Sequence, residues 1–120
     1  MDNGPEQRDE EIRAAIDELN EAHENVRRAR EEGERWQQEN PSPNQPHSVK
    51  SMAEIDRFEH SKNAWNKIYR ERRERLEKAQ ARLHAVQEKL VSLLPEQIGY
   101  EYKGKRYQRE GGSYRTDRIG

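Results

Sequence analysis

Residues 40–47 read Asn-Pro-Ser-Pro-Asn-Gln-Pro-His, and they separate two long stretches that both have the apolar spacing of helices. Each of the three prolines removes a backbone donor and keeps the residue before it out of the helical region, so no helix is expected to cross here. Directly downstream, Ser51 and Glu54 match a capping box, which marks the start of a helix. The segment therefore predicts a connection between two helices.

The stretch before this linker repeats small and apolar residues every three and four positions, which is typical of a helix that packs along another helix. These positions are Ile12, Ala15, Leu19, Ala22, Val26, Ala29, Gly33 and Trp36. The stretch after the linker keeps the same spacing as far as Pro95. Its positions are Ile55, Phe58, Lys62, Trp65, Tyr69, Arg72, Leu76, Ala79, Leu83, Val86, Leu90 and Leu93. We expect Gly33 to leave room for an indole, and Arg72 to reach a carboxylate of the first helix.

Two such helices joined by a linker predict an all-α fold, an antiparallel two-helix coiled-coil hairpin. Beyond Pro95 the aromatic spacing changes to every second residue, and glycines at 104 and 111–112 offer tight turns, so a small C-terminal β-hairpin or meander is expected. The predicted segments are an N-terminal lead over 1–5, helix one over 6–39, a proline-rich linker over 40–49, helix two over 50–94, and a β-like tail rich in tyrosine and basic residues over 95–120.

Composition favours long helices over a thick globular core. Charged residues make up 39% of the chain and hydrophobic residues 29%, against about 25% and 45–50% in ordinary globular domains. Residues 1–39 hold 6 Arg and 13 acidic groups, a net charge of −7, whereas residues 50–120 hold 17 basic and 11 acidic groups, a net charge of +6. Opposite charges on the two halves favour an intramolecular hairpin.

The end of the second helix is expected to be the binding surface. If Trp36 lies beside Ile55, the first helix ends near residue 85 of the second, and the last turns have no covering helix. Such apolar surface is covered by the tail, by a second copy or by another protein. The residues expected to bind a protein partner or form a homodimer are Val86, Leu90, Val91, Leu93, Leu94, Tyr100, Tyr102 and Tyr107. The predicted function is a non-enzymatic protein–protein interaction module, such as an adaptor, an assembly subunit or a small inhibitor of a larger complex.

The alternative is a nucleic-acid-binding accessory protein. The tail interleaves tyrosines with cations, and bases stack on aromatic rings while phosphates pair with Lys and Arg. The candidate contacts are Arg70, Arg73, Lys103, Lys105, Arg106, Arg109 and Arg115. Residues 95–120 hold six basic and four acidic groups, however, and a net charge of +2 is low for a dedicated nucleic-acid binder.

Other function classes have no support in the sequence. No nucleophile elbow, phosphate-binding glycine loop or H-E-x-x-H motif occurs, so no catalytic residue, cofactor or small-molecule substrate is predicted. The histidines are not spaced as metal ligands, and there is no cysteine, so no metal site is expected. They are His23, His47, His60 and His84. Because no signal peptide and no apolar run of about 20 residues is present, a cytoplasmic protein that does not contact a membrane is expected.

Overall fold

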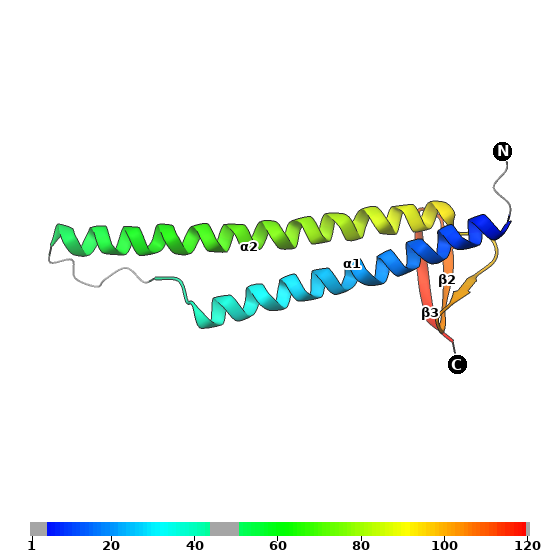
Figure 1. Ribbon diagram of the computed structural model, residues 1–120, viewed down its shortest axis with the longest axis horizontal. Coiled ribbons are helices and arrows are strands. Elements are labelled where there is room, and N and C mark those ends of the chain that lie inside the picture. Colours follow the sequence, from blue (N-terminus) through cyan, green and yellow to red (C-terminus); the bar gives the residue numbers. More distant parts are fainter. Residues whose placement is uncertain (1–4, 44–50, 120) are drawn as a thin grey trace. The chain divides into compact units, whose positions relative to one another are not determined.

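A computed structural model describes residues 5–43 and 51–119 of the protein, which form two helices and three strands (Figure 1). The elements are α1 (Pro5–Glu39), α2 (Met52–Leu93), β1 (Tyr100–Tyr102), β2 (Lys105–Glu110) and β3 (Ser113–Arg118). The chain is mostly helical with a small antiparallel sheet after the second helix, which confirms that part of the predicted fold. His47 and the rest of residues 44–50 lie outside the described residues.

The helix ends follow local sequence signals. The Ser51 hydroxyl accepts a hydrogen bond from the backbone amide of Glu54 at 3.4 Å, which is the serine half of the expected capping box. At the end of α1, both the backbone amide and the side-chain amide of Asn40 donate to the carbonyl of Trp36, at 2.8 and 3.1 Å. Pro95, two residues after the end of α2, cannot continue a helix.

The chain divides into two compact units. Unit 1 contains Met1–Glu24 and Gln80–Gly120, and unit 2 contains Asn25–Ala79. Unit 1 therefore holds the N-terminal part of α1, the C-terminal part of α2 and the whole sheet. Unit 2 holds the remaining parts of the two helices.

In unit 1 the three strands form a meander in the order β1-β2-β3, with both pairs antiparallel. Lys103 and Gly104 have φ angles of 48° and 77°, as a type I′ hairpin turn requires, and Gly111 has a φ of 62° in the second turn. The register pairs Tyr100 with Tyr107. Because neighbouring strands share faces at paired positions, all four tyrosines of the sheet lie on one face. They are Tyr100, Tyr102, Tyr107 and Tyr114.

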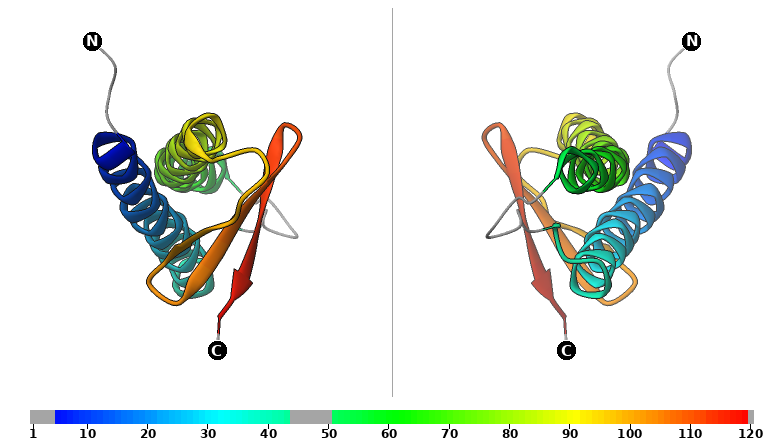
Figure 2. Two further views of the ribbon diagram at one scale, coloured as in Figure 1. Left: turned by 90° about the vertical axis from the view of Figure 1, so that its right-hand side faces the viewer. Right: turned by 90° about the vertical axis from the view of Figure 1, so that its left-hand side faces the viewer.

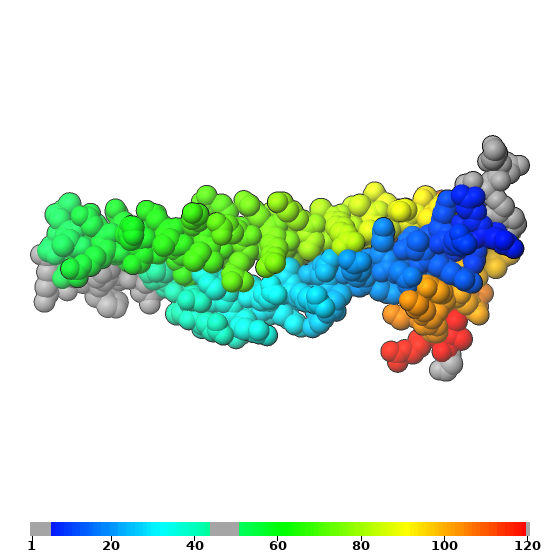
Figure 3. All heavy atoms as spheres, viewed as in Figure 1, coloured from blue at the N-terminus to red at the C-terminus, as the bar shows by residue number. Residues whose placement is uncertain are grey.

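The core of unit 1 has three walls, α1, α2 and the tyrosine face of the sheet (Figure 2). Its buried members are Ile12, Ala15, Ile16, Leu19, Val86, Leu90, Leu94 and Tyr107. Ile16, Leu90 and Leu94 have no exposed surface, and burying a side chain of this size stabilises a fold by about 1.5–3 kcal/mol. The strand residues drawn in orange lie directly against the N-terminal part of α1, drawn in blue (Figure 3).

The prediction that the end of α2 has no covering helix is wrong. The N-terminal part of α1 packs on Leu90 and Leu94, because the two helices pair differently from the expectation. Glu18 lies 3.9 Å from Lys89, and nearby in unit 1 a second ion pair of 3.6 Å joins Glu21 to Arg82. This pairing is displaced by roughly two heptads from the expected one.

In unit 2 the end of α1 lies beside Trp65 rather than beside Ile55. The Trp65 indole N–H donates to the carbonyl of Asn40 at 2.6 Å, and the ring centres of Trp36 and Trp65 are 5.3 Å apart. Placing Trp36 opposite Ile55 was therefore the error that left the end of α2 uncovered in the sequence-based prediction.

We call the positions of the heptad pattern, which face the other helix, the seam. In unit 2 the seam is only half-buried. Among the described residues of unit 2, Val26 is the one buried hydrophobic residue, at 8% exposure. Trp36, Trp65 and Tyr69 keep part of their surface in solvent. A Cβ atom added to Gly33 would meet no atom within 4 Å, so no indole occupies that space and this expectation is also wrong.

Candidate functional site

The structure brings the predicted partner-binding residues together, but in the interior of unit 1. Those that are buried are Val86, Leu90, Val91, Leu94 and Tyr107, and those that are half-buried are Leu93, Tyr100 and Tyr102. The tail tyrosines cover the apolar end of α2 from one side and α1 covers it from another. Of the three ways expected to cover this apolar surface, the structure has the tail, and α1 adds to it. That these residues bind a partner stays a prediction.

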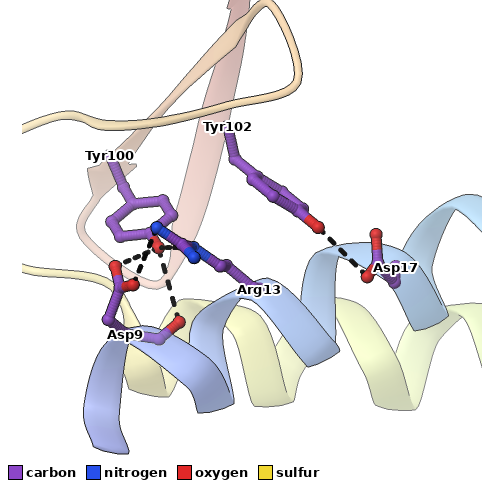
Figure 4. A network of polar contacts seen from close by, with 5 residues as sticks. All are labelled: Asp9, Arg13, Asp17, Tyr100 and Tyr102. Carbon is purple, nitrogen blue, oxygen red and sulfur yellow. Dashed lines mark hydrogen bonds and ion pairs between the residues drawn. The ribbon is translucent and has the colours of Figure 1, made fainter. Parts of the chain in front are cut away.

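In unit 1, a network of hydrogen bonds and ion pairs links the sheet to α1 (Figure 4). The Tyr100 hydroxyl donates to the carboxylate of Asp9 and accepts a hydrogen bond from Nε of Arg13 at 3.3 Å. The Arg13 guanidinium also lies 3.0 Å from the Asp9 carboxylate. Burial, followed by the hydrogen bond to Asp9, raises the pKa of Tyr100 above its ordinary value.

A second part of this network is centred on Asp17. The Tyr102 hydroxyl donates to one carboxylate oxygen at 3.2 Å, and Nζ of Lys103 donates to the other at 2.8 Å. The hydrogen bond from Lys103 is the main cause that lowers the pKa of Asp17. Sequence reasoning missed these roles, although Asp9, Arg13 and Asp17 are spaced by four and therefore form one stripe on the helix.

The core also contains one residue that the heptad pattern omitted. Ile16 has no exposed surface, yet it directly follows the seam position Ala15. Its spacing of four from Ile12 was the available signal, because a helix covered on two sides needs an apolar stripe wider than a two-position seam.

The cations predicted for nucleic acid are divided between the units, and most have partners within the chain. In unit 1, Lys103 is held by Asp17, and Arg115 lies 3.0 Å from both Glu110 and Asp117. Arg109 is half-buried and donates to the carbonyl of Gly111 at 3.3 Å.

The remaining cations of this set differ in their surroundings. In the sheet, Arg106 lies opposite Glu101 on one side and Asp117 on the other, and Lys105 lies opposite Tyr102 and Arg118. In unit 2, Arg73 donates to Glu77 and to the Tyr69 hydroxyl, each at 3.4 Å, while Arg70 is exposed. In the sheet, Arg106 thus lies beside carboxylates, whereas Lys105 does not.

Unit 2 contains a shallow pocket of about 240 Å³ with parts of both helices in its wall. Its lining residues are Glu32, Arg35, Trp36, Glu39, Arg72 and Arg75, and we call it the Trp36 pocket. The Arg72 guanidinium carbon lies 5.6 Å from the Trp36 ring centre, which is a cation–π distance. The Nε atom of Arg72 is buried and has no hydrogen-bond partner among the described residues, so the expected pairing with a carboxylate is not observed there.

The described residues contain neither a metal-ligand cluster nor a membrane-spanning helix. Within residues 5–43 and 51–119, no group of three His, Asp or Glu side chains is placed to hold a metal ion. No helix in the same ranges is both long enough and apolar enough to cross a bilayer. The chain was also compared with protein-family models, curated proteins and solved structures, and it matches none of them.

Proposed function

We propose that this protein is a non-enzymatic protein–protein interaction module, and that it contacts its partner through the Trp36 pocket. The observation that carries this proposal is a concave surface in which the half-buried Trp36 ring lies beside the guanidinium of Arg72 and next to exposed Arg35. Tryptophan, tyrosine and arginine account for much of the binding energy at protein interfaces. With the apolar end of α2 buried, unit 2 offers the better surface.

The scaffold we propose is an antiparallel coiled-coil hairpin. In unit 2, Glu32 pairs with Arg75 at 3.2 Å, while Trp36, further along α1, contacts the earlier residue Trp65 of α2. The two helices therefore run in opposite directions here. Ring contacts of 5.3 Å and 5.1 Å link Trp36, Trp65 and Tyr69 into a row, which holds the wall of the pocket in place.

The partner we expect presents a carboxylate beside an apolar side chain. A carboxylate forms charge-assisted bonds to exposed Arg35, while the apolar group packs on the Trp36 ring. Arg75 is already engaged with Glu32, so these two residues form the rim of the pocket and contribute less to affinity.

The test compares two charge reversals on the same helix, Arg35→Glu in the pocket and Arg30→Glu outside it. Both arginines are exposed, so both variants should keep the wild-type helicity in circular dichroism. In affinity purification from the native host, Arg35→Glu should lose at least 90% of the specific partner, whereas Arg30→Glu should retain it. Equal capture by the two variants would refute the pocket as the contact site.

Fluorescence gives an independent measurement, because the only two tryptophans of the chain, Trp36 and Trp65, contact each other in unit 2. A purified partner that fills the pocket should shift their emission to shorter wavelength. Nucleic-acid binding and a cytoplasmic location stay predictions. A nucleic-acid ligand would be released steeply by salt because many phosphate contacts are lost, whereas docking in the Trp36 pocket, with a single carboxylate, should weaken only modestly between low and moderate salt.

A further inference from the structure

The outer edge of β3 is the open side of the sheet. Within the described residues, β3 pairs with β2 on one side and with no strand on the other. All of its residues are exposed except Tyr114, which is half-buried. β1, at the opposite edge, has three residues, and its two tyrosine hydroxyls are bound to α1. An exposed edge of six residues is a template for another strand.

We propose that the edge of β3 pairs with β3 of a second copy of this chain, antiparallel and with the two-fold axis at Thr116. In this register Arg115 lies opposite Asp117 of the second copy, and Asp117 lies opposite Arg115 of the second copy. Tyr114 lies opposite Arg118, which allows a ring–guanidinium contact. Opposite charges at paired positions stabilise antiparallel strands, and like charges destabilise them.

The neighbouring registers are unfavourable for the same reason. A two-fold axis at Arg115 would place the two copies of Arg115 opposite each other, and an axis at Asp117 would do the same with two carboxylates. An axis between residues would pair opposite faces of the sheet, which the pleat forbids. The sequence of β3 is therefore complementary to itself in the Thr116 register.

The backbone supports the same register. Residues 111 and 112 make a two-residue turn, so Glu110 and Ser113 form the closing pair of the hairpin, and amide and carbonyl groups then point alternately toward and away from β2. Thr116 is one of the residues whose backbone groups point outward, as are Tyr114 and Arg118. The proposed register pairs Thr116 with itself and Tyr114 with Arg118, so outward groups meet outward groups.

Charged residues on an edge strand usually hinder pairing. Here Arg115 and Asp117 already lie 3.0 Å apart within one chain, and the dimer extends this pair into a row of alternating charges. A strand pair of six residues buries less than the roughly 1,200–2,000 Å² of stable complexes, so a dissociation constant in the micromolar range is expected. The proposal is independent of the Trp36 pocket, which belongs to unit 2.

A cysteine cross-link tests the register in the full chain, which contains no cysteine of its own. In Thr116→Cys the two Cα atoms across the axis should be about 5.5 Å apart, within disulfide range. In the matched control, Ser113→Cys, they should be about 20 Å apart. Mild oxidation should therefore cross-link the first variant at least tenfold faster. Equal rates, or no cross-link in either, would overturn the proposal.

Charge complementation is the second test. Wild type should approach twice its mass of 14.3 kDa in sedimentation equilibrium at several hundred micromolar. Arg115→Asp and Asp117→Arg should each weaken self-association at least tenfold, and an equimolar mixture of the two should restore it. A monomeric wild type, or a mixture that stays monomeric, would contradict the proposed pairing.

A folding control and an optical control complete the design. The folding control is the double variant Arg115→Asp/Asp117→Arg, which keeps the charge pair within the chain and is used if either single variant loses structure. This double variant should dimerise as wild type does. A folded but monomeric double variant would refute the register. Tryptophan emission should not change on dimerisation, because both tryptophans lie in unit 2. A failure of this proposal therefore leaves the Trp36 pocket untouched.

Discussion

Unit 1 and unit 2 are built from the same two helices with the same spacing of seam residues, yet their interiors differ. In unit 1 the seam residues Leu19 and Leu90 are buried, together with Ile16 beside the seam. In unit 2 the corresponding positions, such as Leu76 and Trp65, keep part of their surface in solvent. The difference lies in the sheet, which supplies a third wall in unit 1 alone.

The comparison shows what two helices can and cannot bury. Two cylinders touch along a line, so the residues that flank the line stay partly in water, and full burial needs another layer. In unit 1 the tyrosine face of the sheet is that layer, with Tyr107 only 2% exposed.

A charged residue should destabilise the protein far more in the seam of unit 1 than in the seam of unit 2. Leu90→Asp places a carboxylate where no surface is exposed, and a loss of more than about 4 kcal/mol should unfold unit 1. Leu76→Asp, in the half-buried seam of unit 2, should also reduce helicity but cost less. Urea denaturation followed by circular dichroism measures both. Equal losses would mean that the sheet adds nothing to the burial of the helices.

The second largest loss of stability is expected when the sheet loses its main contact with the two helices. Tyr107→Ala deletes a buried ring and should lower the free energy of unfolding by about 3–5 kcal/mol. Tyr69→Ala, a truncation of the same residue type in unit 2, should cost roughly half of that, because the ring is half-buried and stacks on Trp65. A Tyr69 variant as unstable as the Tyr107 variant would contradict the contrast between the units.

A substitution at Gly33 in unit 2 should increase the stability of the protein. Apart from the adjacent residues and backbone of its own helix, a methyl group there meets no atom within 4 Å, so Gly33→Ala should stabilise the protein by about 0.5–1 kcal/mol through helix propensity alone. Gly104→Ala is the control, since its surroundings are equally open but its φ of 77° disfavours any side chain. Thermal midpoints should move upward for the first variant and downward for the second.

The contact between Lys103 and Asp17 in unit 1 should give the smallest effect, seen only as a pH dependence. Lys103 lowers the pKa of Asp17 in the folded state, so the contribution to stability is present above the unfolded pKa of about 3.9 and is lost as the pH falls through the folded value. The stability difference between wild type and Asp17→Asn should therefore shrink from pH 7 toward pH 3. A difference that stays constant would show that this pair contributes nothing.

The local structure follows from the sequence. Prolines in the linker stop α1, the Ser51 cap starts α2, and the glycines at 104 and 111 permit the turns of the meander. The alternation of tyrosine with polar residues assigns the two faces of the sheet. All of these signals act within a few residues, so they do not depend on which parts of the chain meet.

The candidate site was predicted less well. The apolar end of α2 and the tail tyrosines were expected to bind a partner, and in the structure they pack with α1 in the core of unit 1. The Trp36 pocket was missed, because it depends on which arginine of α2 meets Trp36, and that is a question of how the helices pair.

The pairing of the helices is what the tertiary structure alone decided. A heptad pattern repeats every seven residues, so sliding one helix along the other by two heptads keeps every seam position opposite a seam position. The pattern therefore gives nearly equal energy to several registers. Contacts from outside the pattern select one of them, namely the sheet packed on Leu90 and Leu94, and the Trp65 indole bound to the carbonyl of Asn40.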